Sequence, residues 1–216
     1  RYPLMLHFPY FDLYRKQVVK QADLVLAMHL RGDLFTPEQK ARNFRYYEAR
    51  TVRDSSLSST TQAILAAETG HLQLAYDYWA EGAFVDLGDL HGNVDDGLHI
   101  AAMGGAWLVA VAGFGGMRDH GGTLTFAPRL PADLNRLRFH VRQREAVLAV
   151  DIARHEGRVS AEYELVEGEE LHTTHHGEQV HVRTGHPVRM PVPAVPEVEP
   201  VDQPAGRAPV RRVPQS

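Results

Sequence analysis

The sequence predicts a mainly helical first part followed by a small β-sandwich. Over the first half of the chain, apolar residues recur at the spacing of one helix face. After Gly121-Gly122 the period changes to the alternation of half-buried strands. From about residue 187 the chain is rich in proline and valine and has neither period, which predicts an extended or disordered tail. We therefore expect a helical domain over 1–118, a sandwich over 119–187 and a tail over 188–216.

The first two helices are predicted from their periodicity and their start signals. A helix from Phe11 to about Leu30 would bury residues at i, i+4, i+7 and i+8, namely Val18, Ala22, Val25 and Leu26. The next should begin at Thr36-Pro37-Glu38 and run to about Tyr47. This tripeptide combines an N-cap threonine, proline at the first helical position and an acid in the first turn.

Three more helices are expected over 58–68, 71–84 and 98–111. Ser58 or Ser59 can cap the first of these, and Gly70 can end it. The last is apolar nearly all round, which predicts a helix buried on both sides. Its Gly104-Gly105 pair would permit close approach of a neighbouring backbone.

Six short strands with turn signals between them predict the sandwich or part of one. They are expected over 123–126, 137–142, 147–152, 159–165, 170–174 and 179–183.

Composition excludes several classes of protein. The net charge of -4 gives no basic surface for nucleic acid. The absence of cysteine excludes disulfides, thiolate zinc sites and a cysteine nucleophile. The longest apolar run, about 100–112, is shorter than the roughly 20 residues that span a bilayer. We expect a cytoplasmic protein without membrane association. The start lacks a signal peptide and an initiator methionine, which indicates a truncated chain.

Two segments suit a polyhydroxylated ligand and an anion. Lys20 donates hydrogen bonds and Gln21 both donates and accepts, so together they can clamp vicinal sugar hydroxyls. The alternative is a solvated helix face. The loop 50–58 offers Thr51, Ser55 and Ser56 near a helix start, where hydroxyls and backbone N–H groups can hold phosphate oxygens. The alternative is a simple capping loop.

A histidine and a carboxylate complete the predicted site. His99 lies near the positive start of a helix, where a neutral imidazole can donate to an anion or a hydroxyl. It can equally be a histidine with a local partner. Glu48 and Asp54 are the carboxylates best placed to activate water, and Glu48 is our candidate base. Solvated or capping roles are the alternative.

Two further motifs favour ordinary structural roles. The glycines of 113–118 follow a helix and are typical of its end. The histidines of the strand region, His172, His175, His176 and His181, lack a carboxylate-supported ligand set, so we predict no metal site.

Several motifs in one order resemble the C-terminal part of glycoside hydrolase family 65, a family of disaccharide phosphorylases and related hydrolases. They are Lys20-Gln21-Ala22-Asp23, the 50–58 loop, Asp96-Gly97-Leu98-His99, 113–118 and 124–131, within a resemblance that covers about 3–187. The resemblance implies the last helices of an (α/α)6 barrel followed by a small C-terminal β-sandwich. It also implies sugar contacts at Lys20-Gln21, and phosphate or anion contacts in the loop and at His99.

By the same resemblance, the complete enzyme cleaves an α-glucoside such as trehalose, maltose or kojibiose with inversion. Many family members have histidine where this chain has Arg53 and near Gln62, which favours hydrolysis here. Phosphorolysis to β-glucose 1-phosphate, with inorganic phosphate as co-substrate, is the alternative. No other cofactor is implied, and the full-length enzyme could form a homodimer. The family's acid is a glutamate upstream of this chain, so the chain alone should be inactive, or a silent sugar-binding module.

Overall fold

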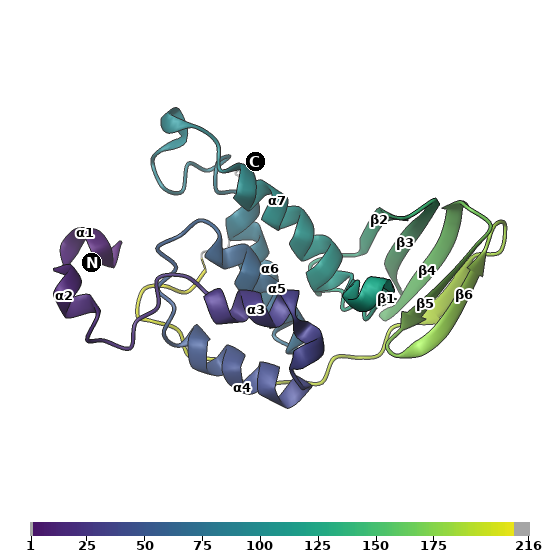
Figure 1. Ribbon diagram of the computed structural model, residues 1–216, viewed down its shortest axis with the longest axis horizontal. Helices are drawn as coiled ribbons and strands as arrows, with labels where there is room; N and C mark the ends of the chain where they lie inside the picture. Colours follow the sequence, from purple (N-terminus) through teal and green to yellow (C-terminus); the bar gives the residue numbers. More distant parts are fainter. Residues whose placement is uncertain (1, 210–216) are drawn as a thin grey trace. The chain divides into compact units, whose positions relative to one another are not determined.

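The computed structural model describes residues 2–209, and its contacts divide the chain into two units (Figure 1). Of the described residues, the first unit contains 2–109 together with 198–209, and the second contains 110–197. The predicted boundaries at 118 and 187 therefore differ from the observed division. Residues 110–118 belong with the strands, and the predicted tail contributes to both units.

The first unit is built from helices joined by loops. They are α1 (Leu4–His7), α2 (Tyr10–Leu13), α3 (Asp23–Leu30), α4 (Pro37–Glu48), α5 (Ser58–Glu68), α6 (Leu72–Ala83) and α7 (Ile100–Leu108), with short 3-10 helices over Gly32–Leu34 and Val94–Asp96.

The predicted helix from Phe11 to Leu30 is interrupted: residues 11–13 lie in α2 and residues 23–30 form α3, but residues 14–22 are not helical. Val19 instead forms a parallel bridge with Thr51, and its N–H and carbonyl bond to the backbone of residues 50 and 52. Backbone pairing with a distant segment therefore replaces helical hydrogen bonds. Lys20 and Gln21 precede α3 and do not lie on a helix.

The start of α4 is confirmed by a complete capping box. The backbone N–H of Gln39 donates to Thr36 Oγ1 at 3.3 Å, and that of Thr36 donates to Gln39 Oε1 at 2.9 Å. The serine cap of α5 is wrong, because the N-cap position is Leu57 and no side chain caps it. Gly70 follows the end of α5 with a φ of +95°, as expected of a glycine in that place.

Helix α5 is the centre of the helical unit. Nearly all of its residues are buried, and it contacts α3, α4, α6 and α7. Glycines allow two of these neighbours to come close. A Cβ at Gly82 of α6 would lie 2.6 Å from Thr60 Cγ2, and one at Gly105 of α7 would lie 2.5 Å from Thr60 Oγ1. Gly105 thus confirms the predicted close approach, whereas Gly104 has no neighbour within 4 Å.

Helix α7 is not buried on both sides within this chain. Ala102 is fully buried, but Ile100 is 68% exposed, Met103 50% and Trp107 54%. The prediction of an enclosed helix is therefore wrong for the part of the molecule described here. A π-helix over Val109–Phe114 follows α7 directly.

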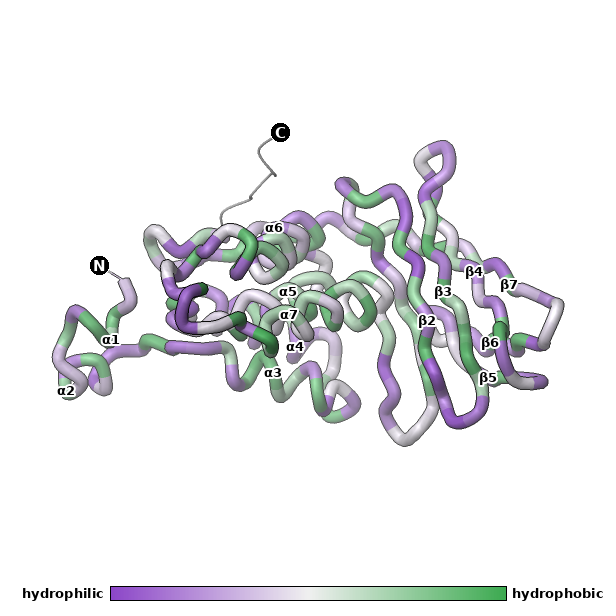
Figure 2. Tube along the Cα trace, turned by 90° about the horizontal axis from the view of Figure 1, so that it is seen from above, coloured by the Kyte–Doolittle hydropathy of each residue, from purple (hydrophilic) through white to green (hydrophobic). Residues whose placement is uncertain are grey.

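The second unit has two sheets around one apolar core. Strands β1 (Thr125–Phe126), β5 (Glu170–His175) and β6 (Glu178–Arg183) form a three-stranded sheet. Strands β2 (Arg136–Gln143), β3 (Ala146–His155), β4 (Arg158–Glu167) and β7 (Val188–Pro191) form a four-stranded sheet in the order β2-β3-β4-β7. Figure 2 shows polar and apolar residues following one another along these strands. The core joins Phe126, Val180 and Val182 of one sheet with Leu148 and Tyr163 of the other, which makes the unit sandwich-like.

Of the two forms expected of the tail, extended or disordered, its first residues take the extended one as a paired strand. Residues 188–191 are strand β7, paired with β4 from Tyr163↔Val188 to Ser160↔Pro191. Residues 198–209, the C-terminal segment, return to the helical unit and appear in yellow in Figure 1. Residues 210–216 of the predicted tail lie outside the described residues. Over the described part, no helix combines the length and the apolar character needed to cross a membrane.

Candidate functional site

The two segments predicted to bind sugar and anion lie side by side. The backbone N–H of Val52 donates to the Val19 carbonyl at 2.8 Å, and that of Asp54 donates to the Lys20 carbonyl at 3.1 Å. These bonds fix the Lys20-Gln21 segment against the first half of the 50–58 loop. The structure therefore brings together two motifs that are about thirty positions apart in the sequence.

Lys20 lines a cavity of about 230 Å³ on one side of this pairing. The cavity is also bordered by Asp54 and Val52 of the loop and by the rings of Tyr10 and Tyr14. It therefore combines apolar and aromatic walls with two cations, Lys16 and Lys20, and one carboxylate, a combination that suits a small polar ligand. Gln21 is engaged locally, because its Nε2 donates to Asp23 Oδ1 at 2.9 Å.

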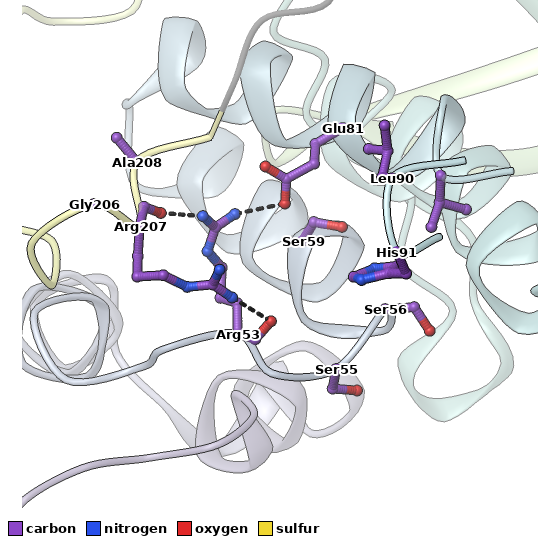
Figure 3. A pocket seen from close by; sticks show the side chains of 11 residues that line it. Arg53, Ser55, Ser56, Ser59, Glu81, Leu90, His91, Gly206, Arg207 and Ala208 are labelled. Atoms are coloured by element: carbon purple, nitrogen blue, oxygen red, sulfur yellow. Dashed lines mark hydrogen bonds and ion pairs between the residues drawn. The ribbon is translucent and has the colours of Figure 1, made fainter. Parts of the chain in front are cut away.

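Ser55 and Ser56 line a second cavity of about 200 Å³, which we call the serine cavity (Figure 3). Arg53, Glu81 and His91 also border it. The two predicted serines therefore border one shared space. Thr51 does not, because it is buried and its hydroxyl donates to the Tyr47 carbonyl at 2.8 Å. The Thr51 hydroxyl proton is used inside the chain, so Thr51 has no donor to offer an anion.

Arg53 is the most constrained residue of this second cavity. Its residue is 5% exposed, its φ is +55°, and its Nη1 donates to Glu81 Oε1 at 2.7 Å. Its guanidinium also lies 4.7 Å from the centre of the Tyr78 ring. A left-handed backbone at a non-glycine residue is costly and is often found at functional sites. Glu81 neutralises the Arg53 charge, and Arg207 borders the same cavity as a second guanidinium.

Glu48 lies in a buried hydrogen-bond cluster and lines neither cavity. Its Oε2 accepts from Gln62 Nε2 at 2.6 Å, and its Oε1 accepts from Gln203 Nε2 at 2.8 Å and from the Tyr78 hydroxyl. Burial raises the pKa of Glu48, and these three donors together with the Arg53 charge partly oppose the rise. A general base must reach water, and in this structure the Glu48 carboxylate borders neither cavity.

His99 is held by an aspartate beside the start of α7. Its Nδ1 lies 2.6 Å from Asp86 Oδ1, and its backbone N–H donates to Asp86 Oδ2 at 2.9 Å. The hydrogen bond from the His99 side chain lowers the pKa of Asp86. His99 lines neither cavity, but its ring centre is 5.6 Å from that of His91, which lines the serine cavity. The structure therefore places His99 one residue behind this cavity.

The strand histidines do have a carboxylate beside them, contrary to the sequence prediction. Glu170, His172 and His181 of β5 and β6 bring one ligand atom each within 4.8 Å of the others, and His181 Nε2 lies 2.9 Å from Glu170 Oε2. However, the two imidazole rings are stacked with an interplanar angle of 12°. Their in-plane lone pairs therefore lie in two nearly parallel planes, which is poor geometry for sharing one metal ion.

The glycine-rich stretch 113–118 has the structural role expected of it. Gly116 has a φ of +61°, and a Cβ there would meet the Ala127 backbone. Arg118 Nη1 donates to the carbonyls of Ala112 and Met117.

Sequence reasoning missed Glu81 and Arg207 at the serine cavity, and Gln203 in the buried Glu48 cluster. Glu81 lies three positions after Tyr78 on α6, so helical spacing could have placed both on the face toward the loop. Gln203 and Arg207 come from the predicted tail, and no local signal links them to residues 48–54.

Two family models match the chain. The model of the glycosyl hydrolase family 65 central catalytic domain matches residues 1–108, and that of the family's C-terminal domain matches residues 117–182. The chain belongs to glycosyl hydrolase family 65. This family assignment agrees with the resemblance carried by the loop 50–58 and by Lys20-Gln21.

Curated relatives of the family 65 chain include hydrolases and phosphorylases by name. It is 51% identical to an uncharacterized glycosyl hydrolase of Mycobacterium leprae over 98% of this chain and 26% of the relative. It is 41% identical to the α,α-trehalose phosphorylase of Thermoanaerobacter brockii over 79% of this chain and 22% of the relative. It is 39% identical to the maltose phosphorylase of Bacillus subtilis over 82% and 23%. The chain thus spans about a quarter of the length of these relatives.

A solved structure supports the fold. A protein assigned as a kojibiose phosphorylase from the human microbiome matches with a TM-score of 0.80 and 25% sequence identity, covering 88% of this chain and 24% of that one. The family's helical and sandwich-like parts are therefore both represented in this chain.

Proposed function

We propose that the full-length protein cleaves an α-linked glucose disaccharide with inversion, and that water is the attacking group. Family 65 membership supports the class of reaction, and the relatives named for trehalose and maltose support the class of substrate. The adjacency of the Lys20 segment and the serine loop supports a binding site in this chain. Lys20 and Gln21 would contact sugar hydroxyls, and Ser55 and Ser56 would contact the attacking group or its neighbours.

The helical unit would form part of an (α/α)6 barrel in the full-length protein. The exposed apolar residues of α7, including Ile100, Met103 and Trp107, support this proposal. Large apolar side chains exposed together are typical of surfaces that pack against other protein. The missing helices of the barrel would cover them and would carry the glutamate that protonates the leaving oxygen.

The Arg53–Glu81 pair is the observation that favours hydrolysis over phosphorolysis. A phosphate site needs donors whose charge is available to the anion. Here the Arg53 guanidinium is buried and donates to Glu81 at 2.7 Å, and Gln62 donates to Glu48. Many phosphorylases carry histidine at or near these two positions. Here the side chains of both residues are engaged in hydrogen bonds within the chain. Phosphorolysis, with inorganic phosphate as co-substrate, is the alternative that the names of the relatives keep open.

Incubation of the full-length protein with trehalose, maltose and kojibiose, with and without phosphate, tests this proposal. We expect glucose to be released at the same rate in both conditions. Release of glucose 1-phosphate that depends on phosphate would overturn the preference for hydrolysis. The same preparation, measured by light scattering, tests whether the full-length protein is the homodimer that the resemblance implies.

A silent sugar-binding role for this chain alone is the second candidate. This role is favoured by the state of Glu48, the candidate base, which is buried and hydrogen-bonded to Gln203. Calorimetry of the chain with glucose and disaccharides should then show binding without turnover. Reproducible turnover by the 216-residue chain would show that a proton donor is present in it.

A further inference from the structure

The C-terminal segment forms a reciprocal pair of hydrogen bonds with the loop 50–58. Arg53 Nη2 donates to the Arg207 carbonyl, and Arg207 Nη2 donates to the Arg53 carbonyl at 2.7 Å (Figure 3). Each arginine therefore holds the backbone of the other. The two residues are more than 150 positions apart in the sequence, so the contact closes a long loop.

Arg207 binds two consecutive carbonyls of the loop with one guanidinium. Its Nε donates to the Val52 carbonyl while its Nη2 donates to that of Arg53, and Asp54 Oδ1 lies 3.5 Å away. A planar guanidinium suits this arrangement, because its donors are fixed in a fork. These carbonyls flank the residue whose φ is +55°, so Arg207 holds the strained part of the loop.

Gln203 anchors the same segment a few residues earlier. Its Nε2 donates to Glu48 Oε1 at 2.8 Å and to the Tyr78 hydroxyl oxygen at 2.7 Å. Glu48 ends α4 and Tyr78 lies on α6, so this one amide connects two helices. The segment is thus fixed at two points, one on the loop and one on the buried cluster below it.

We propose that Arg207 is a positioning residue of the serine cavity, which it serves by holding residues 52–54 in the conformation that presents Arg53, Ser55 and Ser56. Gln203 is its second anchor. The C-terminal segment also contributes Gly206, Arg207 and Ala208 to the cavity wall, so the cavity has its observed form only with this segment in place. The catalytic part of this inference rests on the proposed function, whereas its structural part does not.

Hydrogen exchange in the full-length protein tests the structural part without any need for activity. The amides of Val52 and Asp54 are bonded to the Val19 and Lys20 carbonyls. In Arg207→Ala we expect these amides to exchange about tenfold faster, because opening of the loop is then less costly. Arg207→Lys, which keeps the charge but not the fork, should exchange at an intermediate rate and guards against a variant that fails to fold.

Glu199→Gln is the matched control on the same segment. Glu199 is exposed and reaches only Arg45, at 3.7 Å, so exchange in residues 52–54 should equal that of the wild type. Unchanged exchange in Arg207→Ala, or equally fast exchange in Glu199→Gln, would overturn the assignment to Arg207.

Kinetics then test the catalytic part. If the wild type cleaves a disaccharide, Arg207→Ala should raise its KM about tenfold while the unfolding midpoint changes by only a few degrees. A KM equal to that of the wild type would overturn the positioning role. A wild type without activity would instead contradict the proposed function. The exchange experiment would still decide whether Arg207 holds residues 52–54 in place.

Discussion

At the scale of single residues, Glu48 shows how burial sets protonation. Burial raises its pKa above the ordinary value of 4.5, so the folded protein holds this proton more tightly than the unfolded chain. The favourable contribution of Glu48 to folding is therefore fully present below about pH 4.5 and is lost as the pH rises through the raised pKa. Each pKa unit between the two states corresponds to about 1.4 kcal/mol.

Replacement of Glu48 by glutamine should remove this pH dependence. Gln62 can turn its amide so that its Oε1, which accepts no hydrogen bond among the described residues, accepts from the new side chain. We expect the wild type to lose more unfolding free energy than E48Q between pH 4 and pH 8. Chemical denaturation of both proteins at the two pH values measures the difference. Identical losses would show that the Glu48 carboxyl has an ordinary pKa.

In the second unit, His175 changes stability with pH in the direction opposite to Glu48. Its Nε2 donates to the Pro191 carbonyl at 3.0 Å, so its Nδ1 accepts from the Tyr163 hydroxyl at 2.8 Å. Burial is the main cause that lowers the pKa of His175 below its usual 6.5. As the pH falls below about 6.5, the unfolded chain takes up this proton first, and stability falls.

A His175→Gln variant should retain both hydrogen bonds without titrating. We expect the decrease in unfolding midpoint from pH 7.5 to pH 5.5 to be smaller in this variant than in the wild type. Thermal unfolding at the two pH values measures it. A decrease as large as that of the wild type would assign the acid sensitivity to other histidines.

At the scale of elements, Gly105 determines how closely α7 approaches α5. An alanine there would place its Cβ 2.5 Å from Thr60 Oγ1, and both helix backbones would have to move. We expect Gly105→Ala to destabilise the protein by about 1–3 kcal/mol. Gly104→Ala is the matched control, because its Cβ meets nothing within 4 Å. It should stabilise the helix by about 0.5–1 kcal/mol. Equal effects of the two substitutions on the denaturation midpoint would contradict this packing.

Local sequence signals predicted the ends of helices better than the segments whose structure depends on distant partners. The Thr36-Pro37 start and the Gly70 end depend on nearby residues, and both were confirmed. The predicted helix was wrong over residues 14–22, and the expected tail begins as a paired strand, because distant partners decide both segments. Val19 pairs with Thr51, and residues 188–191 pair with β4.

At the scale of the whole molecule, the candidate site joins three distant stretches of the chain. The resemblance placed Lys20, Ser55 and Ser56 in one region, and the backbone pairing supports that placement. The contacts of Gln203 and Arg207 could not be predicted from the sequence. They form only because the C-terminal segment packs against residues about 150 positions earlier in the chain. The exposed apolar face of α7 and the span of about a quarter of each relative both favour a larger catalytic unit.

The anomer of the first product tests the central claim most directly. Full-length protein and trehalose in phosphate-free buffer, followed by proton NMR from the first minutes, would show the newly released sugar before it mutarotates. In trehalose both anomeric centres are α, so inverting hydrolysis predicts β-glucose from the attacked unit and an equal amount of α-glucose from the leaving unit, at a rate that added phosphate does not change. Initial release of α-glucose alone, or no release until phosphate is added, would contradict the account.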